Sequence, residues 1–251
     1  MPRYTVFTLA GPLASFGGVA GNERRGSMDR PGHSMLVGLV SAAFGIRRSD
    51  EDQLARLSAA CRFAVRADAP GHPLIDYHTV QTAALRRGVA PTTRKQLLDG
   101  GRAEGRLDTT LTRREYRTDV RFTVAVELEG ETFTHEAIDD ALRRPRLVLY
   151  LGRKSCPPSL PLDPMAMTAE TVPQAFAAYD DATGHRARDL SSFWQGDGTI
   201  SGDATIFPPK AVNLPHRRES RRVKPLSRRT WQFALLDDLV LLDPPADGAP
   251  S

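Results

Sequence analysis

Residues 76–78, Asp-Tyr-His, contain a possible acid–base group, a stacking ring and a hydrogen-bond acceptor. Cleavage of an RNA strand without a metal requires a base for the 2′-hydroxyl, an acid for the leaving oxygen and a cation for the phosphate. Tyr77, His78 and Lys154 supply these residue types. A single histidine on a strand is more often a structural or binding group, so we interpret the run first as a binding element and keep catalysis as the alternative.

The glycine-rich segment 21–34 is a candidate site for binding an anion. Ser34 can cap a predicted helix at the end of this segment. Four basic residues precede that helix: Arg24, Arg25, Arg30 and His33. Backbone N–H groups and the helix dipole favour an anion there, and guanidinium groups bind phosphate through two hydrogen bonds. The segment therefore predicts a phosphate cradle, and the alternative is a flexible surface loop with Ser34 as an ordinary cap.

A third candidate segment, residues 151–158, follows a predicted strand. The chain leaves that strand through Gly152 into Arg153, Lys154 and Ser155. Cations at the end of a strand are held more rigidly than cations on a loop, which suits contacts to a phosphate backbone. The alternative is a solvated turn.

The positive charge is concentrated in two parts of the chain, which has 251 residues and a formal net charge of +4. Residues 86–121 contain ten Lys or Arg against five acids, and residues 210–229 contain eight against one. These segments carry about +5 and +7, so the remainder is close to −8. Such clustering favours a polyanionic partner, although each segment could also be a solvated loop.

The rest of the composition indicates a globular protein without a cofactor. Its two cysteines, Cys61 and Cys156, cannot form a zinc site alone and are expected to be free thiols. The sequence has no Walker loop, HExxH motif or paired CxxC motif, so no metal or cofactor is expected. It also has no long apolar stretch and no leader-like N-terminus, and we expect a cytoplasmic location.

The hydrophobic patterns predict an α+β fold in ferredoxin-like order. Predicted strands cover residues 4–10, 61–66, 74–81, 120–128 and 147–152, and predicted helices run from Ser34 to Gly45 and over 134–142. Around residues 82–111 no apolar face is sustained, which is typical of an inserted arm. In a ferredoxin-like fold the helices cover one sheet face and leave the other available for RNA.

The C-terminal part has a weaker pattern. We expect a helix over 172–179, a strand over 231–236, an otherwise irregular basic region, and a disordered tail over 241–251.

Five segments resemble the CasD-type subunits of type I-E CRISPR Cascade complexes in order and spacing, over about the first 160 residues. They are GPLASFGG at 11–18, residues 23–48, DYHTVQ at 76–81, RREYRTDVRFTVAV at 113–126 and YLGRKSCPP at 150–158. The combination of DYHTVQ, REY and LGRKSCPP is the specific part of the likeness. His33 stands where family members often have Lys or Arg, and Phe16 where they often have Trp.

The resemblance implies an RNA-recognition-type palm at 1–81 and 115–160, a β-rich thumb at 82–114, and a C-terminal region at 161–240 that completes the fold. It implies a non-catalytic subunit that grips the 5′ handle of the guide RNA (crRNA). The implied partners are a CasC-type backbone subunit and a CasA-type large subunit, with target DNA reached only through the complex. In related type I-C systems a CasD-like protein is itself the nuclease, so a repeat-specific endoribonuclease is the alternative.

The motifs and the resemblance together give one set of expected RNA contacts. These residues are Arg24, Arg25, Arg30, His33, Ser34, Tyr77, His78, Arg114, Tyr116, Arg153, Lys154 and Ser155. Arg24, Arg25, Arg30, Arg153 and Lys154 are expected at phosphates. Tyr77, His78, Arg114 and Tyr116 are expected near bases or riboses.

Overall fold

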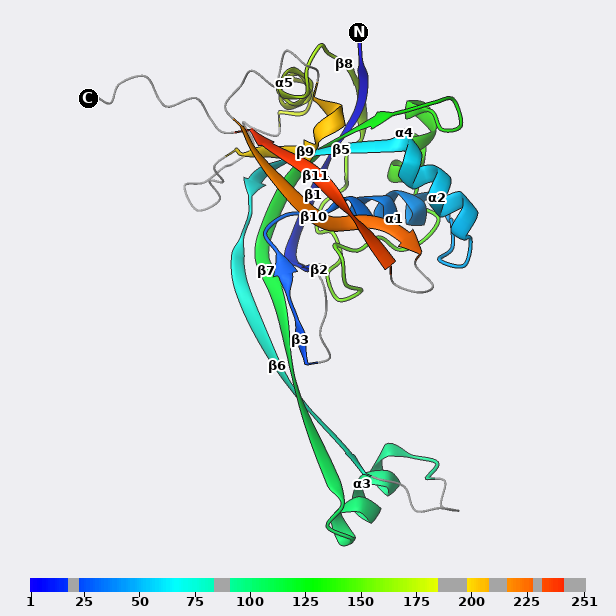
Figure 1. The fold of residues 1–251 in the computed structure, drawn as a ribbon, viewed down its shortest axis with the longest axis vertical. Coiled ribbons are helices and arrows are strands. Elements are labelled where there is room, and N and C mark those ends of the chain that lie inside the picture. The colour runs from blue at the N-terminus through cyan, green and yellow to red at the C-terminus, as the bar shows by residue number, and fades with distance from the viewer. Residues whose placement is uncertain (18–22, 84–90, 185–197, 208–215, 228–231, 242–251) are drawn as a thin grey trace, which may run out of the picture.

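The computed structural model describes residues 1–17, 23–83, 91–184, 198–207, 216–227 and 232–241 (Figure 1). Its main feature is a nine-stranded sheet in which seven strands follow the order β10-β11-β9-β5-β7-β1-β8, while β3 and β6 pair with β7 alone. These strands are β1 (Arg3–Ala14), β3 (Arg24–Arg25), β5 (Cys61–Ala69), β6 (His72–Ala83), β7 (Leu107–Leu128), β8 (Met165–Thr168), β9 (Ile200–Asp203), β10 (His216–Ser227) and β11 (Gln232–Leu241). The protein is thus a mixed α+β fold built on a large, mostly antiparallel sheet.

The centre of the sheet agrees in part with the predicted order, because β1, β5 and the inner part of β7 are strands where expected, with helices before β5 and after β7. Strands β8, β1, β7 and β5 lie side by side and antiparallel. Helices α1 (His33–Phe44) and α2 (Glu51–Ala60) connect β1 to β5, and α4 (His135–Arg143) follows β7. Helix α1 ends at Gly45, as the sequence predicts, and Gly45 is in the left-handed conformation. The Thr134 side chain caps α4 by accepting from Ala137 N, so Thr134 precedes this helix and is not part of it.

Two local predictions are wrong. Ser34 does not cap α1, because the extended residue Gly32 is the N-cap and Ser34 lies inside the first turn. Residues 147–152 form no strand, and β8 takes the position beside β1 instead. The backbone of Leu151 is held locally, since its N–H donates to Cys156 O at 2.7 Å and its carbonyl accepts from Ser15 N at 3.0 Å.

Both faces of the sheet are covered, contrary to the expectation of an open RNA-binding face. One core packs α1, α2 and α4 against Phe63, Val124 and other side chains of the sheet. The second core packs helix α5 (Val172–Thr183) and the 3-10 helix η1 (Ala204–Ile206) against the opposite face, where Phe176 meets Tyr4 and Val6. Apolar burial over β5 and β7 therefore alternates between two filled cores.

A buried ion network ties α5 to this second face. Arg66 of β5 donates from both Nη atoms to the two carboxylate oxygens of Asp180 in α5, each at 2.8 Å. Its Nε donates to Asp68 at 2.6 Å, and Thr123 lies within hydrogen-bond distance of both Arg66 and Asp68. The guanidinium also lies 5.2 Å from the ring centroid of Phe176.

A long hairpin projects from the sheet (Figure 1). Its strands are β6 and the first part of β7, paired from His72 with Thr118 to Ala83 with Leu107. Helix α3 (Arg94–Ala103) lies at its tip, where the sequence predicts an irregular segment. Gly101 of this helix packs so closely on Ala83 that an added Cβ would lie 2.3 Å from the Ala83 Cβ. The thumb arginines Arg86 and Arg87 lie outside the described residues.

The C-terminal region is more regular than the sequence predicts. Strands β10 and β11 form an antiparallel hairpin, and β11 continues the sheet through β9. The hairpin crosses α1 (Figure 1), and β10 packs on α1 and α2. Strand β10 has the sequence HRRESRRVKPLS, which shows no apolar alternation. Its strand conformation therefore depends on pairing with β11 and could not be predicted from its own composition. The disordered tail is predicted over 241–251, but Leu241 is the buried last residue of β11, and residues 242–251 lie outside the described residues.

Candidate nucleic-acid interface

The root of the long hairpin brings three of the sequence motifs together. Strand β3 runs parallel to β7, with Arg24 beside Arg113 and Arg25 beside Arg114. On the other side of β7, Tyr77 of β6 pairs with Arg113. Residues that are far apart in the sequence therefore form one ribbon of three strands, rich in arginine. Because neighbouring residues of a strand point to opposite sides, this ribbon has two chemically distinct faces.

The first face carries two arginines in fixed contacts. Arg24 donates from Nε and Nη2 to Glu115 Oε1 at 3.0 and 2.8 Å, and Ser27 N donates to Glu115 Oε2 at 3.3 Å. The guanidinium of Arg113 lies 5.1 Å from the ring centroid of Tyr77, and its Nη2 is 3.4 Å from the Tyr77 hydroxyl. Tyr77 is 54% exposed, so part of its ring remains available for stacking.

The electrostatics of this face centre on Glu115. The hydrogen bond from Arg24, the hydrogen bond from the Ser27 N–H and the positive charges of Arg24 and Arg153 lower the pKa of the Glu115 carboxyl. Glu115 is therefore a carboxylate at neutral pH. It occupies a position between a guanidinium and a backbone N–H, which are also the donors that bind phosphate oxygens.

Arg153 anchors the turn that begins the 151–158 segment to the same ribbon. Its guanidinium lies 4.6 Å from the ring centroid of Tyr116 and donates to Glu115 O at 3.2 Å and Arg25 O at 3.1 Å. Gly152 makes this approach possible, because its φ is +90° and an added Cβ would lie 1.9 Å from Ser15 O. The neighbours of Arg153 on the exposed side are Lys154 and Ser155.

The remaining ribbon residues lie on the second face. Tyr116 is 8% exposed and belongs to the first core, so it supports Arg153 and does not offer its own ring. The Arg114 Nε is buried without a hydrogen-bond partner among the described residues. His78 contacts the carboxylate of Asp76, two residues back on the same strand. Tyr77 and His78 are adjacent on β6, so their side chains leave from opposite faces.

Three of the expected contact residues lie away from this ribbon. His33 is 6% exposed, its Nε2 is 3.0 Å from Ser58 Oγ, and its ring packs edge-on against Phe63. Ser34 is half-buried in the first turn of α1. Arg30 is 8% exposed and contacts Glu219 of β10. The start of α1 is thus covered by the C-terminal hairpin.

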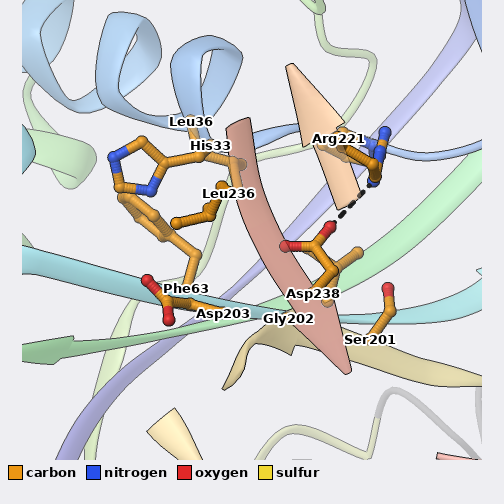
Figure 2. Close-up of a pocket in the computed structure, with 11 residues that line it drawn as sticks. His33, Leu36, Phe63, Ser201, Gly202, Asp203, Arg221, Leu236 and Asp238 are labelled. Atoms are coloured by element: carbon orange, nitrogen blue, oxygen red, sulfur yellow. Dashed lines mark hydrogen bonds and ion pairs between the residues drawn. The ribbon is translucent and has the colours of Figure 1, made fainter. Parts of the chain in front are cut away.

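A small cavity lies between His33 of α1 and residues of β9 and β11, including Ser201 and Asp238 (Figure 2). Its volume of about 20 Å³ suits about one water and not a nucleotide. Among the described residues no group of three or more His, Cys, Asp or Glu could hold a metal ion. No helix in that part of the chain is long and apolar enough to cross a membrane. Cys61 and Cys156 are buried free thiols, as expected.

Sequence reasoning missed two residues of the site, Glu115 and Arg113. Both belong to the RREYR segment from which Arg114 and Tyr116 were selected. The signal was the period of two: on a strand, Arg113 and Glu115 share one face, while Arg114 and Tyr116 share the other. Recognising β3 as the neighbouring strand would have required the tertiary structure.

The chain is similar to known CRISPR proteins over nearly its whole length. The family described as CRISPR-associated protein (Cas_Cas5) matches residues 4–237. The Escherichia coli (strain K12) protein named CRISPR system Cascade subunit CasD is 32% identical over 235 residues, which cover 93% of each chain. The likeness therefore extends well beyond the first 160 residues.

Two solved structures share the fold. One chain, described as a CRISPR RNA-guided surveillance complex, gives a TM-score of 0.57 at 23% identity and covers 95% of this chain and 89% of the other. A second, described as a crystal structure of a Cas protein, gives 0.56 at 24% identity and covers 95% and 94%. Together with the family match and the CasD identity, this places the chain in the Cas5/CasD family of CRISPR-associated proteins.

Proposed function

We propose that this protein is a non-catalytic subunit of a type I-E Cascade complex that grips the 5′ handle of the guide RNA. The observation that carries the proposal is the arginine ribbon at the root of the hairpin, where Arg24 lies beside Arg113 and Arg153 is anchored to the backbone carbonyls of Arg25 and Glu115. The relative named as a Cascade subunit supports the assembly. In it the chain contacts a CasC-type backbone subunit and a CasA-type large subunit, and meets target DNA only through the complex.

The ribbon supplies the two kinds of contact that single-stranded RNA requires. Arg24, Arg25 and Lys154 are exposed cations that can neutralise phosphates. Tyr77, with Arg113 on its ring, is an exposed platform on which a base can stack. Arg24, Arg25 and Tyr77 are held by main-chain ladders, so little backbone conformational freedom is lost at these residues when the RNA binds.

The central strands β8-β1-β7-β5 serve in this proposal as the ferredoxin-like palm, and the long hairpin serves as the thumb. Their antiparallel order, with helices between β1 and β5 and after β7, supports the palm assignment. The sheet face opposite α1 is filled by α5. The RNA therefore runs over the root of the hairpin and not across an open sheet.

The arrangement of Tyr77 and His78 supports a binding role over cleavage. A base and an acid must reach the same phosphodiester, but these two side chains leave β6 on opposite faces. His78 is also engaged by Asp76. An endoribonuclease would need a different pair of groups.

Binding and cleavage are separated by one experiment with the purified full chain. We expect RNA carrying the repeat handle to bind more tightly than RNA of scrambled sequence, and to stay intact during incubation in EDTA. Arg153→Ala should weaken binding about tenfold, since it removes a cation that also anchors the 151–158 segment to the ribbon. Cleavage that His78→Ala abolishes would establish the nuclease alternative. Equal binding of both RNAs would indicate only a general basic module.

A further inference from the structure

The loop before α1 is fastened to the C-terminal hairpin by Arg30. This residue lies among glycines and arginines yet is only 8% exposed. Its Nη1 donates to Asp29 at 3.1 Å, and its Nη2 contacts the Glu219 carboxylate on β10. Glu219 also receives an ion pair from Arg217 on the same strand. The loop and the hairpin are 189 residues apart in the sequence.

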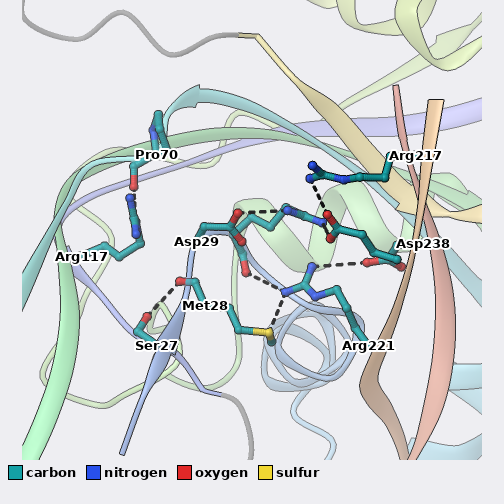
Figure 3. Close-up of polar contacts among 10 residues, drawn as sticks. Ser27, Met28, Asp29, Pro70, Arg117, Arg217, Arg221 and Asp238 are labelled. Carbon is teal, nitrogen blue, oxygen red and sulfur yellow. Dashed lines mark hydrogen bonds and ion pairs between the residues drawn. The ribbon is translucent and has the colours of Figure 1, made fainter. Parts of the chain in front are cut away.

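A second arginine makes the reverse connection. Arg221 of β10 reaches toward the loop, where its Nη2 donates to Met28 Sδ at 3.0 Å and to Arg30 O at 3.4 Å. Its Nη1 is paired with Asp238 of β11 at 3.3 Å. Figure 3 shows Arg221 lying between Met28 and Asp238. The loop and the hairpin are thus joined by two guanidinium groups, one from each segment.

These contacts bear on whether Arg30 can bind RNA directly. The Arg30 Nε is buried and has no hydrogen-bond partner among the described residues, so the side chain is enclosed by protein. Turning it outward to a phosphate would break its contacts with Asp29 and Glu219 and leave Glu219 paired with Arg217 alone. Arg30 is therefore better suited to hold the loop than to hold RNA.

The loop residues that contact the C-terminal hairpin are connected to the arginine ribbon through Ser27. Met28 and Ser27 form strand β4 (Ser27–Met28), which pairs with β2 (Phe16–Gly17). Ser27 donates its N–H to Glu115, and Glu115 accepts both hydrogen bonds of Arg24. A shift of the loop at Met28 would therefore move Ser27, and with it the carboxylate that orients Arg24.

We propose that the β10–β11 hairpin is a strap that positions the arginine loop, with Arg30 and Glu219 as its fastening pair. Arg30 is then a positioning residue and not an RNA ligand. The effect on RNA affinity rests on the proposed function, whereas the coupling between loop and hairpin does not.

Hydrogen exchange in the full chain tests the coupling without RNA. Glu219→Gln removes the charge at the junction and should raise amide exchange in a peptide covering residues 24–32 at least tenfold. Asp237→Asn is the matched control, because it removes an acidic charge from the same hairpin where the carboxylate contacts Ser220 and not the loop. Unchanged loop exchange in Glu219→Gln, or an equal rise in Asp237→Asn, would overturn the strap.

RNA affinity gives a second test through the sign of the effect. If Glu219 fastens the loop, Glu219→Gln weakens binding of handle RNA. If Glu219 instead keeps Arg30 from binding a phosphate of the RNA, the same change strengthens binding. That result would refute the proposal. Failure of the wild-type chain to bind RNA would count against the proposed function alone, because the exchange experiment decides the coupling.

A double variant covers the case in which a single change prevents folding. Replacing Arg30 and Glu219 together by Met removes the buried cation together with its partner carboxylate while keeping apolar volume, so folding should be retained. We expect the double variant to keep the wild-type salt slope of RNA binding. A slope reduced by roughly 0.7 would mean that Arg30 contacts a phosphate, contrary to the proposal.

Discussion

Arg24 and Glu115 are joined at the root of the hairpin by two hydrogen bonds to a single carboxylate oxygen, at 3.0 and 2.8 Å. Arg24 is itself largely exposed, with 75% of its side-chain surface accessible. An exposed cation held by a neighbouring carboxylate is oriented for binding but partly neutralised. An incoming phosphate must compete with Glu115 for the same guanidinium.

Glu115→Gln keeps an acceptor oxygen that can orient Arg24 but removes the competing negative charge. It should therefore strengthen binding of single-stranded RNA at low salt, by roughly threefold to tenfold, with the gain shrinking as salt rises. Titrations at several salt concentrations would measure it. Glu131→Gln removes the same charge from an exposed position after β7 and should have a smaller effect. Weaker binding of Glu115→Gln at every salt concentration would show that Glu115 acts mainly by orienting Arg24.

Arg113→Lys tests whether the ribbon acts through geometry or only through charge. Lysine keeps the positive charge but loses the planar contact with the Tyr77 ring. We expect about fivefold weaker binding with an unchanged salt slope. Arg94→Lys at the hairpin tip is the control, because Arg94 contacts only the Gln81 carbonyl in the hydrogen bonds described for it. Identical affinities for both variants would favour a simple basic tether.

Gly152→Ala should destabilise the fold and weaken RNA binding together. The left-handed φ and the approach to Ser15 O leave no room for a methyl group, so we expect a loss of more than about 3 kcal/mol in the free energy of unfolding. Gly130→Ala separates strain from collision, since Gly130 has φ +79° but nothing within 4 Å of the added Cβ. That control should cost about 1–2 kcal/mol. Urea denaturation measures both, and equal losses would contradict the steric argument.

Arg66→Ala should cost about 3–5 kcal/mol of folding stability, because it leaves Asp180 and Asp68 buried without their shared cation. Arg62→Ala on the same strand removes a more exposed arginine, whose pairs are with Glu127 and Glu129, and should cost less than about 1 kcal/mol. Urea denaturation measures the free energy of unfolding of both variants, and equal losses would contradict a stabilising role of the buried ion network.

Two buried tyrosines predict an alkaline transition. Burial raises the pKa of Tyr4 and of Tyr179 to about 12, from an ordinary value of 10. Because the folded pKa is raised, the stabilising contribution is complete below pH 10 and is lost as the pH rises through about 12. Absorbance of tyrosinate should therefore show a late phase that Tyr4→Phe and Tyr179→Phe each reduce. A single phase near pH 10 in the folded protein would contradict the burial.

Local sequence patterns were sufficient for much of the palm. Alternation identified β1, β5 and the inner half of β7, the helical pattern over 134–142 identified α4 to within one residue, and Gly45 marked the end of α1. These features depend on near neighbours, because burial period and capping act within a few residues. The motif segments were also sufficient to indicate the family that the whole-chain comparisons show.

Long-range pairing decided the rest. Residues 147–152 have the composition of a strand but do not pair, whereas the arginine-rich β10 becomes a strand through β11. Arg30 resembles an RNA ligand in the sequence, yet Glu219 holds it in the interior. Residue types, their period and the family could be read from the sequence. Which cations remain exposed could not be read from it, because burial and ion pairing depend on segments such as those of Arg30 and Glu219, which are 189 residues apart.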